Sequence, residues 1–132
     1  MTHEVDCFSL SSTYVVLGDD GSAIPVAVSD RFFEALEHKF GDFKGKRLLS
    51  HFTFHQDWDT WEMHPAGDEF VCLLSGQVDL ILEQVGAEKT VRLSTPGSYT
   101  LIPQGIWHTA KVHTPCSMLF ITPGEGTQNR PL

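Results

Sequence analysis

Most of the chain after Lys46 consists of short apolar runs separated by glycines and prolines, and this pattern restricts the fold more than any other feature. Between residues 51 and 55, histidine and threonine alternate with Phe52 and Phe54, a period of two that is typical of a half-buried strand. Further apolar runs follow at residues 70–74, 78–82, 91–93, 99–102 and 118–122. The pattern predicts an all-β sandwich, jelly roll or barrel over residues 47–122 and excludes repeated βαβ units.

The first 46 residues predict one strand and one helix. Residues 14–17 indicate a short strand, which ends at a cluster of turn-forming residues. Residues 29–40 predict a helix, which Ser29 or Asp30 is expected to cap and Gly41 to end. Its apolar face is expected to dock against the rest of the fold and consists of Phe32, Phe33, Leu36 and Phe40. No repeat or long linker interrupts the sequence, so residues 1–132 are expected to form one domain.

The charge of the chain limits its possible binding partners, and its cysteine content indicates the cellular compartment. Nine basic against seventeen acidic residues give a net charge of −8, which disfavours nucleic acid and anionic membrane surfaces as partners. The three cysteines form no disulfide framework and no CxxC pair, so free thiols are expected. The N-terminus is acidic where a signal peptide would be basic, and no apolar run is long enough to span a membrane. We therefore expect a cytoplasmic protein.

A candidate metal site lies in the segment from Trp61 to Glu69. Residues two apart on a strand share a face, so Glu62 and His64 are expected to project together. A turn with proline and glycine follows, and it can bring Glu69 back beside them. Two carboxylates and an imidazole in one pocket are oxygen and nitrogen ligands for a divalent first-row metal, and they would repel each other without a cation.

A second segment, residues 97–108, runs from a strand into a Pro-x-Gly turn and ends at His108. Together the two segments resemble the two signature motifs of the cupin superfamily. Glu62, His64, Glu69 and Gly76 occupy the positions of the first motif, and Gly97, Pro103, Gly105 and His108 match the second. The sequence departs from the first motif where Glu62 replaces a histidine and Gln56 a glycine, and from the second where Val112 replaces an asparagine.

The resemblance implies a double-stranded β-helix, or jelly-roll barrel, with one divalent metal ion per chain on Glu62, His64, Glu69 and His108. Mixed nitrogen and oxygen ligands suit Fe, Mn, Ni, Zn or Co rather than Mg or Ca. Glu62 has two interpretations: it is a fourth ligand, or it is a catalytic base beside a two-histidine, one-carboxylate set. A third possibility is a degenerate cupin in which Glu62 pairs with a cation and no metal binds.

Other aromatic and imidazole side chains carry weaker signals. His51 and His55 either line the barrel mouth or form a polar outer face, with phenylalanines inward. The three tryptophans are interpreted as core or subunit contacts rather than a substrate platform, and Trp61 is out of phase with Glu62.

The resemblance leaves the reaction open, because the cupin fold hosts several activities. We expect a metal-dependent enzyme that acts on a small organic molecule, with a dioxygenase ahead of an isomerase or lyase. The alternative is a non-catalytic sensor module that binds a metal or a small ligand. A homodimer is expected from the resemblance and from the aromatic side chains of Trp58, Trp61 and the N-terminal strand, taken as exposed.

Overall fold

The computed structural model describes residues 5–132, so part of the acidic N-terminus discussed above lies outside the described residues. The elements are β1 (Thr13–Leu17), β2 (Ala23–Ala27), α1 (Phe32–Phe40), β3 (Arg47–Phe54), β4 (Thr60–Met63), β5 (Glu69–Gln84), β6 (Ala87–Leu93), β7 (Tyr99–Ile102), β8 (His108–Thr122) and β9 (Gln128–Pro131). Within this range, no helix has the length and apolar character needed to cross a membrane.

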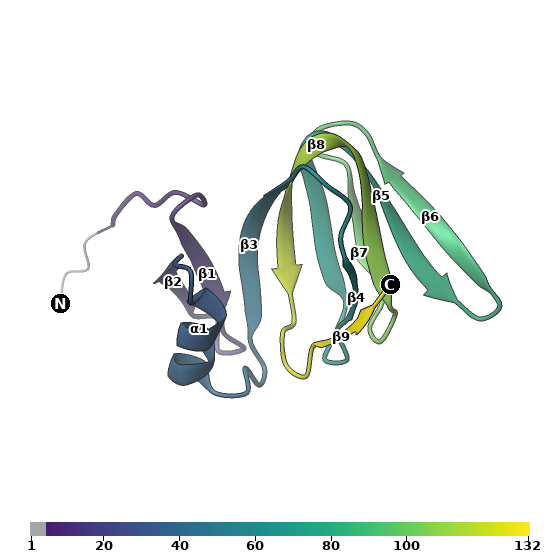
Figure 1. The fold of residues 1–132 in the computed structure, drawn as a ribbon. Helices are drawn as coiled ribbons and strands as arrows, with labels where there is room; N and C mark the ends of the chain where they lie inside the picture. The colour runs from purple at the N-terminus through teal and green to yellow at the C-terminus, as the bar shows by residue number, and fades with distance from the viewer. Residues whose placement is uncertain (1–4) are drawn as a thin grey trace.

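Two long strands, β5 and β8, pair with each other along their length and belong to both layers of the fold (Figure 1). In one layer, the first half of β5 pairs with β7, and the second half of β8 pairs with β3. Strand β3 also pairs with β1, and β1 pairs with β2. In the other layer, the second half of β5 pairs with β6, and the start of β8 pairs with β4. Strand β4 also pairs with β9. Two antiparallel layers that share bent strands form a jelly roll, as the sequence predicted.

The bend in β5 explains the glycine of the first motif. Register shifts interrupt the pairing of β5 with β8 between Leu73 and Asp79. At the centre of this stretch Gly76 has a φ of 78°, and a Cβ there would lie 2.1 Å from the carbonyl oxygen of Pro115 on β8. Any other residue would be strained in backbone and would collide with the partner strand. Gly76 therefore allows both strands to pass from one layer to the other.

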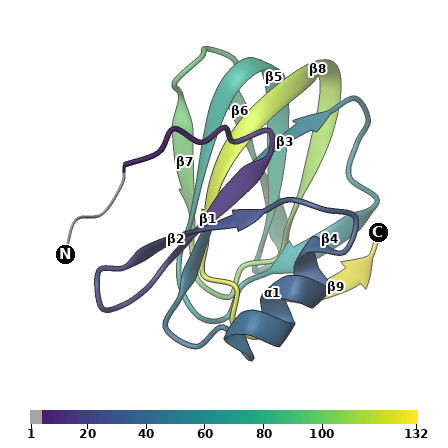
Figure 2. The same cartoon turned by 90° about the vertical axis from the view of Figure 1, so that its left-hand side faces the viewer.

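The buried apolar side chains of residues 5–132 form two clusters that meet at Phe52. One fills the jelly roll and is centred on β5 and β8, with Leu73, Leu80 and Met118 fully buried. The other lies under α1, where Phe32 and other residues pack on β1. Phe52 packs against both clusters. Figure 2 shows α1 in front of the lower end of the strands, with β1 and β2 above it.

The N-terminal and C-terminal elements differ from the prediction in detail. The helix begins at Phe32 rather than at residue 29, and neither Ser29 nor Asp30 caps it with a side chain. The physical reason is a turn before the helix, where the amide of Phe32 donates to the carbonyl of Ser29. Gly41 ends the helix as predicted, with a φ of 64°. The strands β2 and β9 were not predicted, so the sheet extends beyond residues 47–122 at both ends.

Candidate metal centre

The four predicted ligands converge at one end of the jelly roll. Glu62 lies on β4 opposite His108, the first residue of β8, and His64 follows β4 directly. Glu69, the first residue of β5, lies between the two histidines: its Oε2 is 3.3 Å from Nε2 of His64, and its Oε1 is 3.2 Å from Nε2 of His108. Oε1 of Glu62 is 3.8 Å from Nε2 of His64.

Direct hydrogen bonds hold the turns of the two motifs together. The amide of Gly105 donates to the carbonyl of His64 (3.0 Å). The amide of Gln104 donates to Oδ1 of Asp68 (2.8 Å), and its side-chain amide donates to the carbonyl of Pro65 (2.6 Å). The second turn is thus fastened to the first, which brings His108 beside residues far away in sequence.

Hydrogen bonds on the far side of each imidazole fix its tautomer. Nδ1 of His108 lies 3.1 Å from the carbonyl of Ile106, which can only accept, so Nδ1 carries the hydrogen. Nδ1 of His64 lies 2.9 Å from the hydroxyl of Thr127, which itself donates to the carbonyl of Gly124. Nδ1 of His64 is therefore also a donor. In the neutral imidazoles, both Nε2 atoms present lone pairs to the oxygens of Glu69.

This arrangement requires a positive charge at its centre. Three buried polar atoms of the cluster lack a hydrogen-bond partner among the described residues: Nε2 of His64, Nε2 of His108 and Oε1 of Glu69. When two donor atoms bind one ion at about 2.1 Å with a donor–metal–donor angle between about 90° and 109°, they lie about 3.0–3.4 Å apart. The observed 3.2 and 3.3 Å match that spacing. The residues present can therefore hold a divalent metal ion, and Glu62, His64 and His108 are also close enough to share one.

Solved structures show the same architecture. No protein-family model matches the sequence, and no curated protein matches it. A cupin-2 domain containing protein from Shewanella frigidimarina superposes with a TM-score of 0.50 at 18% identity, over 58% of this chain and 70% of that one. The chain has the cupin fold. Oxalate decarboxylase from Bacillus subtilis, whose Mn(II) centres have been studied, gives a TM-score of 0.52 at 16% identity.

The similarity to oxalate decarboxylase is partial. It covers 65% of this chain but 24% of the decarboxylase chain. At this level of identity it establishes the architecture, and the activity of that larger protein does not follow from it.

Burial and charge shift the pKa values of the cluster. Burial raises the pKa of Glu62, and the neighbouring carboxylate of Glu69 raises it further. Burial also opposes ionisation of Glu69, but its close contacts with the imidazoles of His108 and His64 outweigh burial and lower the pKa of Glu69 to about 2. Burial opposes the charged form of His108, yet its contacts with Glu69 raise the pKa of the imidazole overall. Without a metal, a proton on His108 supplies positive charge beside Glu69.

Glu62 differs from the other three residues in its exposure. Its side chain is 30% exposed, whereas those of His64, Glu69 and His108 are buried. It lines the adjoining cavity as well as the cluster. A carboxylate at this boundary has the position required of a ligand and also that of a base facing a substrate.

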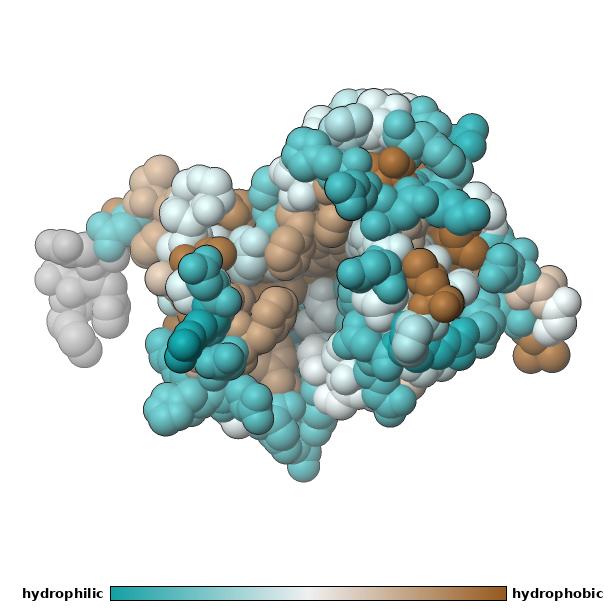
Figure 3. All heavy atoms as spheres, in the orientation of Figure 1, coloured by the Kyte–Doolittle hydropathy of each residue, from teal (hydrophilic) through white to brown (hydrophobic). Residues whose placement is uncertain are grey.

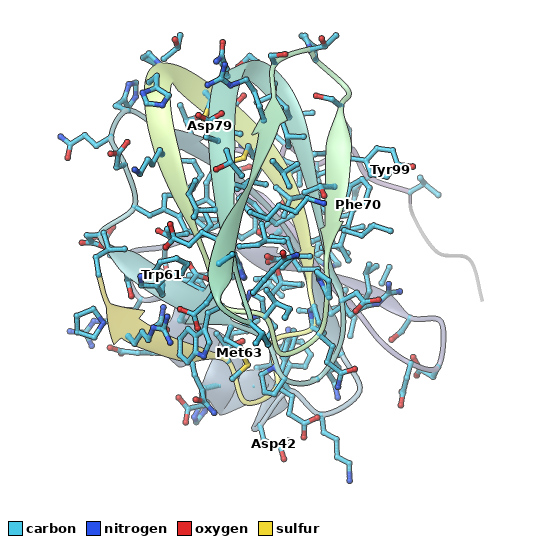
Figure 4. The ribbon with its side chains drawn as sticks, turned by 90° about the vertical axis from the view of Figure 1, so that its right-hand side faces the viewer. Asp42, Trp61, Met63, Phe70, Asp79 and Tyr99 are labelled. Carbon is cyan, nitrogen blue, oxygen red and sulfur yellow. The ribbon has the colours of Figure 1, made fainter. Side chains whose placement is uncertain are left out.

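The C-terminal segment supports the centre, and the motifs gave no signal for it. Thr127 fixes His64, and the strand β9 that follows pairs with β4. Arg130 fastens β9, because its guanidinium lies 5.3 Å from the ring centre of Trp61 and 4.6 Å from that of Trp107, and it also pairs with Glu83. Figure 4 shows Trp61 beside the C-terminal strand. Trp61 thus lies outside the site, as its phase predicted.

A cavity of about 1040 Å³ opens beside the centre, and Figure 3 shows the apolar hollow between the N-terminal elements and the jelly roll. Phe52 and Phe54 line it, which supports the interpretation with phenylalanines inward and histidines outward. Trp58 packs against the core as expected but also lines the cavity, which was not expected. The hydroxyl of Thr122, another residue that sequence reasoning missed, donates to Oε2 of Glu69 (2.6 Å).

Proposed function

We propose that this cupin binds one divalent metal ion through Glu62, His64, Glu69 and His108 and is an enzyme that acts on a small organic molecule. One observation carries the metal proposal. Two imidazoles with fixed tautomers direct their Nε2 lone pairs at a single buried carboxylate, at 3.3 and 3.2 Å. The adjoining cavity supports the proposal of a small-molecule substrate.

The donor set of two nitrogens and two carboxylates suits Fe, Mn, Ni, Zn or Co. The Mn(II) centres of oxalate decarboxylase, a protein of related fold, are consistent with such a metal. A bound ion of this kind supplies Lewis acidity towards a substrate oxygen and, if it is redox-active, supports oxygenase chemistry.

The protein's own residues perform three tasks in this proposal. Thr127 and the carbonyl of Ile106 hold the imidazoles in the tautomer that binds metal. Glu62, whose pKa is raised by burial, can accept a proton from a substrate at its carboxylate oxygen. The aromatic residues of the cavity, such as Phe54, exclude water from the reacting groups.

A dioxygenase is the leading subtype, and an isomerase or lyase is the second. Because oxalate decarboxylase has a similar fold, decarboxylation of a small acid is one of the lyase reactions to consider. Among the described residues that line the cavity, however, none is lysine or arginine, so nothing there pairs with the carboxylate of such a substrate.

The test is the metal content of the chain purified without an affinity tag. The proposal expects about one equivalent of a transition metal per chain. Glu62→Gln separates the two roles of Glu62: loss of metal identifies a ligand, and retained metal with lost activity identifies a base. Metal-free protein that takes up no added ion would establish the degenerate cupin. Stoichiometric metal and ligand binding without turnover would establish the sensor.

We also propose a homodimer, on different grounds from those given by the sequence. The expected exposure of Trp58 and Trp61 is wrong, because both are half-buried. Apolar side chains instead gather on the outer face of β5 and β7, where Leu74, Tyr99 and Leu101 are 41%, 59% and 58% exposed. Light scattering should give about twice the 14.7 kDa of one chain, and a monomer at micromolar concentration would contradict the proposal.

A further inference from the structure

One side of the cavity is formed by four contacting aromatic rings, Phe52, Phe54, Trp58 and Phe120, which we call the aromatic wall. The ring centre of Phe54 lies 6.0 Å from that of Phe52 and 5.6 Å from that of Trp58. The ring centres of Phe52 and Phe120 are 5.9 Å apart. Trp58 also lies 6.1 Å from the imidazole of His108. The aromatic wall therefore extends directly to the metal cluster.

The rest of the cavity away from the cluster is also largely apolar. Leu36 on α1 and Leu48 on β3 line it, as does Phe43 between them. Phe33, which the sequence placed on the docking face of the helix, is 63% exposed and lies at the cavity instead. A volume of about 1040 Å³ is at the upper end of the range for small-molecule sites, so a two-carbon acid would leave most of it empty.

The charged residues that line the cavity are all acidic or belong to the cluster. Glu37 and Asp42 lie near the helix end, and Glu62 and Glu69 belong to the cluster. No lysine or arginine lines the cavity among the described residues. A divalent ion on two carboxylates and two neutral imidazoles has a net charge of about zero, so the centre itself does not attract an anion strongly.

Resting on the proposed metal site, we propose that the cavity binds a neutral molecule with an aromatic or similarly flat apolar ring and an oxygen-bearing substituent. The ring lies on the aromatic wall, where ring stacking and apolar burial favour it. The oxygen faces the end that carries Glu62 and the histidines. An anion would be buried beside acidic groups with no basic partner. A cationic substituent directed at the cluster would lie beside the divalent ion, which already engages the carboxylates of the cluster.

The test uses four probes that differ mainly in charge: benzyl alcohol, benzoate, benzylammonium and oxalate. Calorimetric titration of the full chain at neutral pH, with its metal content measured, should give a roughly millimolar Kd for benzyl alcohol. Benzoate should bind at least about tenfold more weakly, and oxalate more weakly still, because each leaves a negative charge without a basic partner. Benzylammonium should also bind more weakly, because its charge would face the metal at the cluster end, and pairing with Glu37 or Asp42 near the helix end would take the substituent away from the cluster. Equal or tighter binding of any charged probe, or no binding of benzyl alcohol, would overturn the inference.

Two variants and a matched control locate the ligand. Phe54→Leu should weaken benzyl alcohol roughly three- to tenfold, whereas Phe70→Leu, on the outer face of β5, should leave it unchanged. Asp42→Asn should strengthen benzoate roughly two- to threefold and leave benzyl alcohol unaffected. Equal effects of Phe54→Leu and Phe70→Leu would place the ligand elsewhere.

The same samples distinguish this inference from the proposed function. Metal-containing protein that prefers benzoate or oxalate would refute the neutral ring ligand and leave the metal site standing. If protein without metal still binds benzyl alcohol, and Phe54→Leu weakens that binding as expected, the metal site is refuted and the ligand class stands.

Discussion

The cavity has two ends that are built by different means. At the polar end, side chains from three strands meet that of His64, which follows β4, and a few directional hydrogen bonds hold them, such as the one from His64 to Thr127. At the apolar end, residues of α1, β3 and β8, such as Leu36 and Phe120, meet through non-directional packing. The polar end thus depends on orientation, and the apolar end on the area buried.

This difference separates two measurable properties. Changes at the polar end should alter metal binding more than the stability of the fold, because the cluster is a costly arrangement of buried charges. Changes at the apolar end should alter stability and ligand binding but leave the metal in place.

Replacing both imidazoles, as His64→Ala with His108→Ala, should abolish metal binding. The site would lose both of its nitrogen donors, and two carboxylates alone bind such a metal weakly. Elemental analysis should fall from about one ion per chain to near zero. The control is the double variant His51→Ala, His113→Ala, whose imidazoles lie outside the cluster. Stoichiometric metal in the first double variant would refute the site.

At the apolar end, Leu36→Ala should lower the free energy of unfolding by about 2–4 kcal/mol, because it leaves a cavity between α1 and β1. Urea denaturation measures this change. The metal content should stay at about one ion per chain, and the exposed neighbour Phe33→Ala should have a much smaller effect on unfolding. Parallel loss of metal in Leu36→Ala would show that the two ends are coupled.

Thr127→Val should weaken metal affinity by about 10- to 100-fold, because His64 loses the acceptor that fixes its tautomer. Thr127→Ser keeps the hydroxyl and should retain most of the affinity. Competition with a chelator measures both values. Equal affinities in the two variants would mean that the hydroxyl does not position His64.

Acidification should release the metal. The pKa of His108 is raised in the metal-free fold, so its proton stabilises that fold at low pH, and this contribution is lost as pH rises through the raised pKa. Metal must displace that proton. Apparent affinity should therefore fall as pH drops below the raised pKa, by about tenfold per pH unit for each imidazole that must lose a proton. An affinity that does not change across this range would contradict metal binding at Nε2.

The smallest effect is expected at the fastening of β9. Arg130→Met keeps an apolar stem between Trp61 and Trp107 but removes the cation and its pairing with Glu83. The free energy of unfolding should fall by about 0.5–2 kcal/mol, and metal affinity should fall only a few-fold. The exposed Arg31→Met serves as the control in the same denaturation series.

The sequence was sufficient for the jelly roll and for the four residues that meet at the centre. Alternation after Lys46 predicts strands because the side-chain period of a strand is two. The spacing within residues 62–69 brought Glu62, His64 and Glu69 together, because a turn of defined length returns the chain to one face, and the resemblance to the second cupin motif added His108. The start of the helix was misplaced, since a turn between Ser29 and Phe32 competes with a side-chain cap.

Only the tertiary structure determined what surrounds the centre. Thr127 reaches His64 across 63 residues of sequence, and Thr122 reaches Glu69 across 53, so no local pattern could indicate either contact. The cavity has the same origin, because Leu36, Phe54 and Trp58 face one space only after α1 packs beside the jelly roll. Local sequence fixes which face of a strand a side chain occupies, whereas contacts between distant segments exist only once the chain has closed on itself.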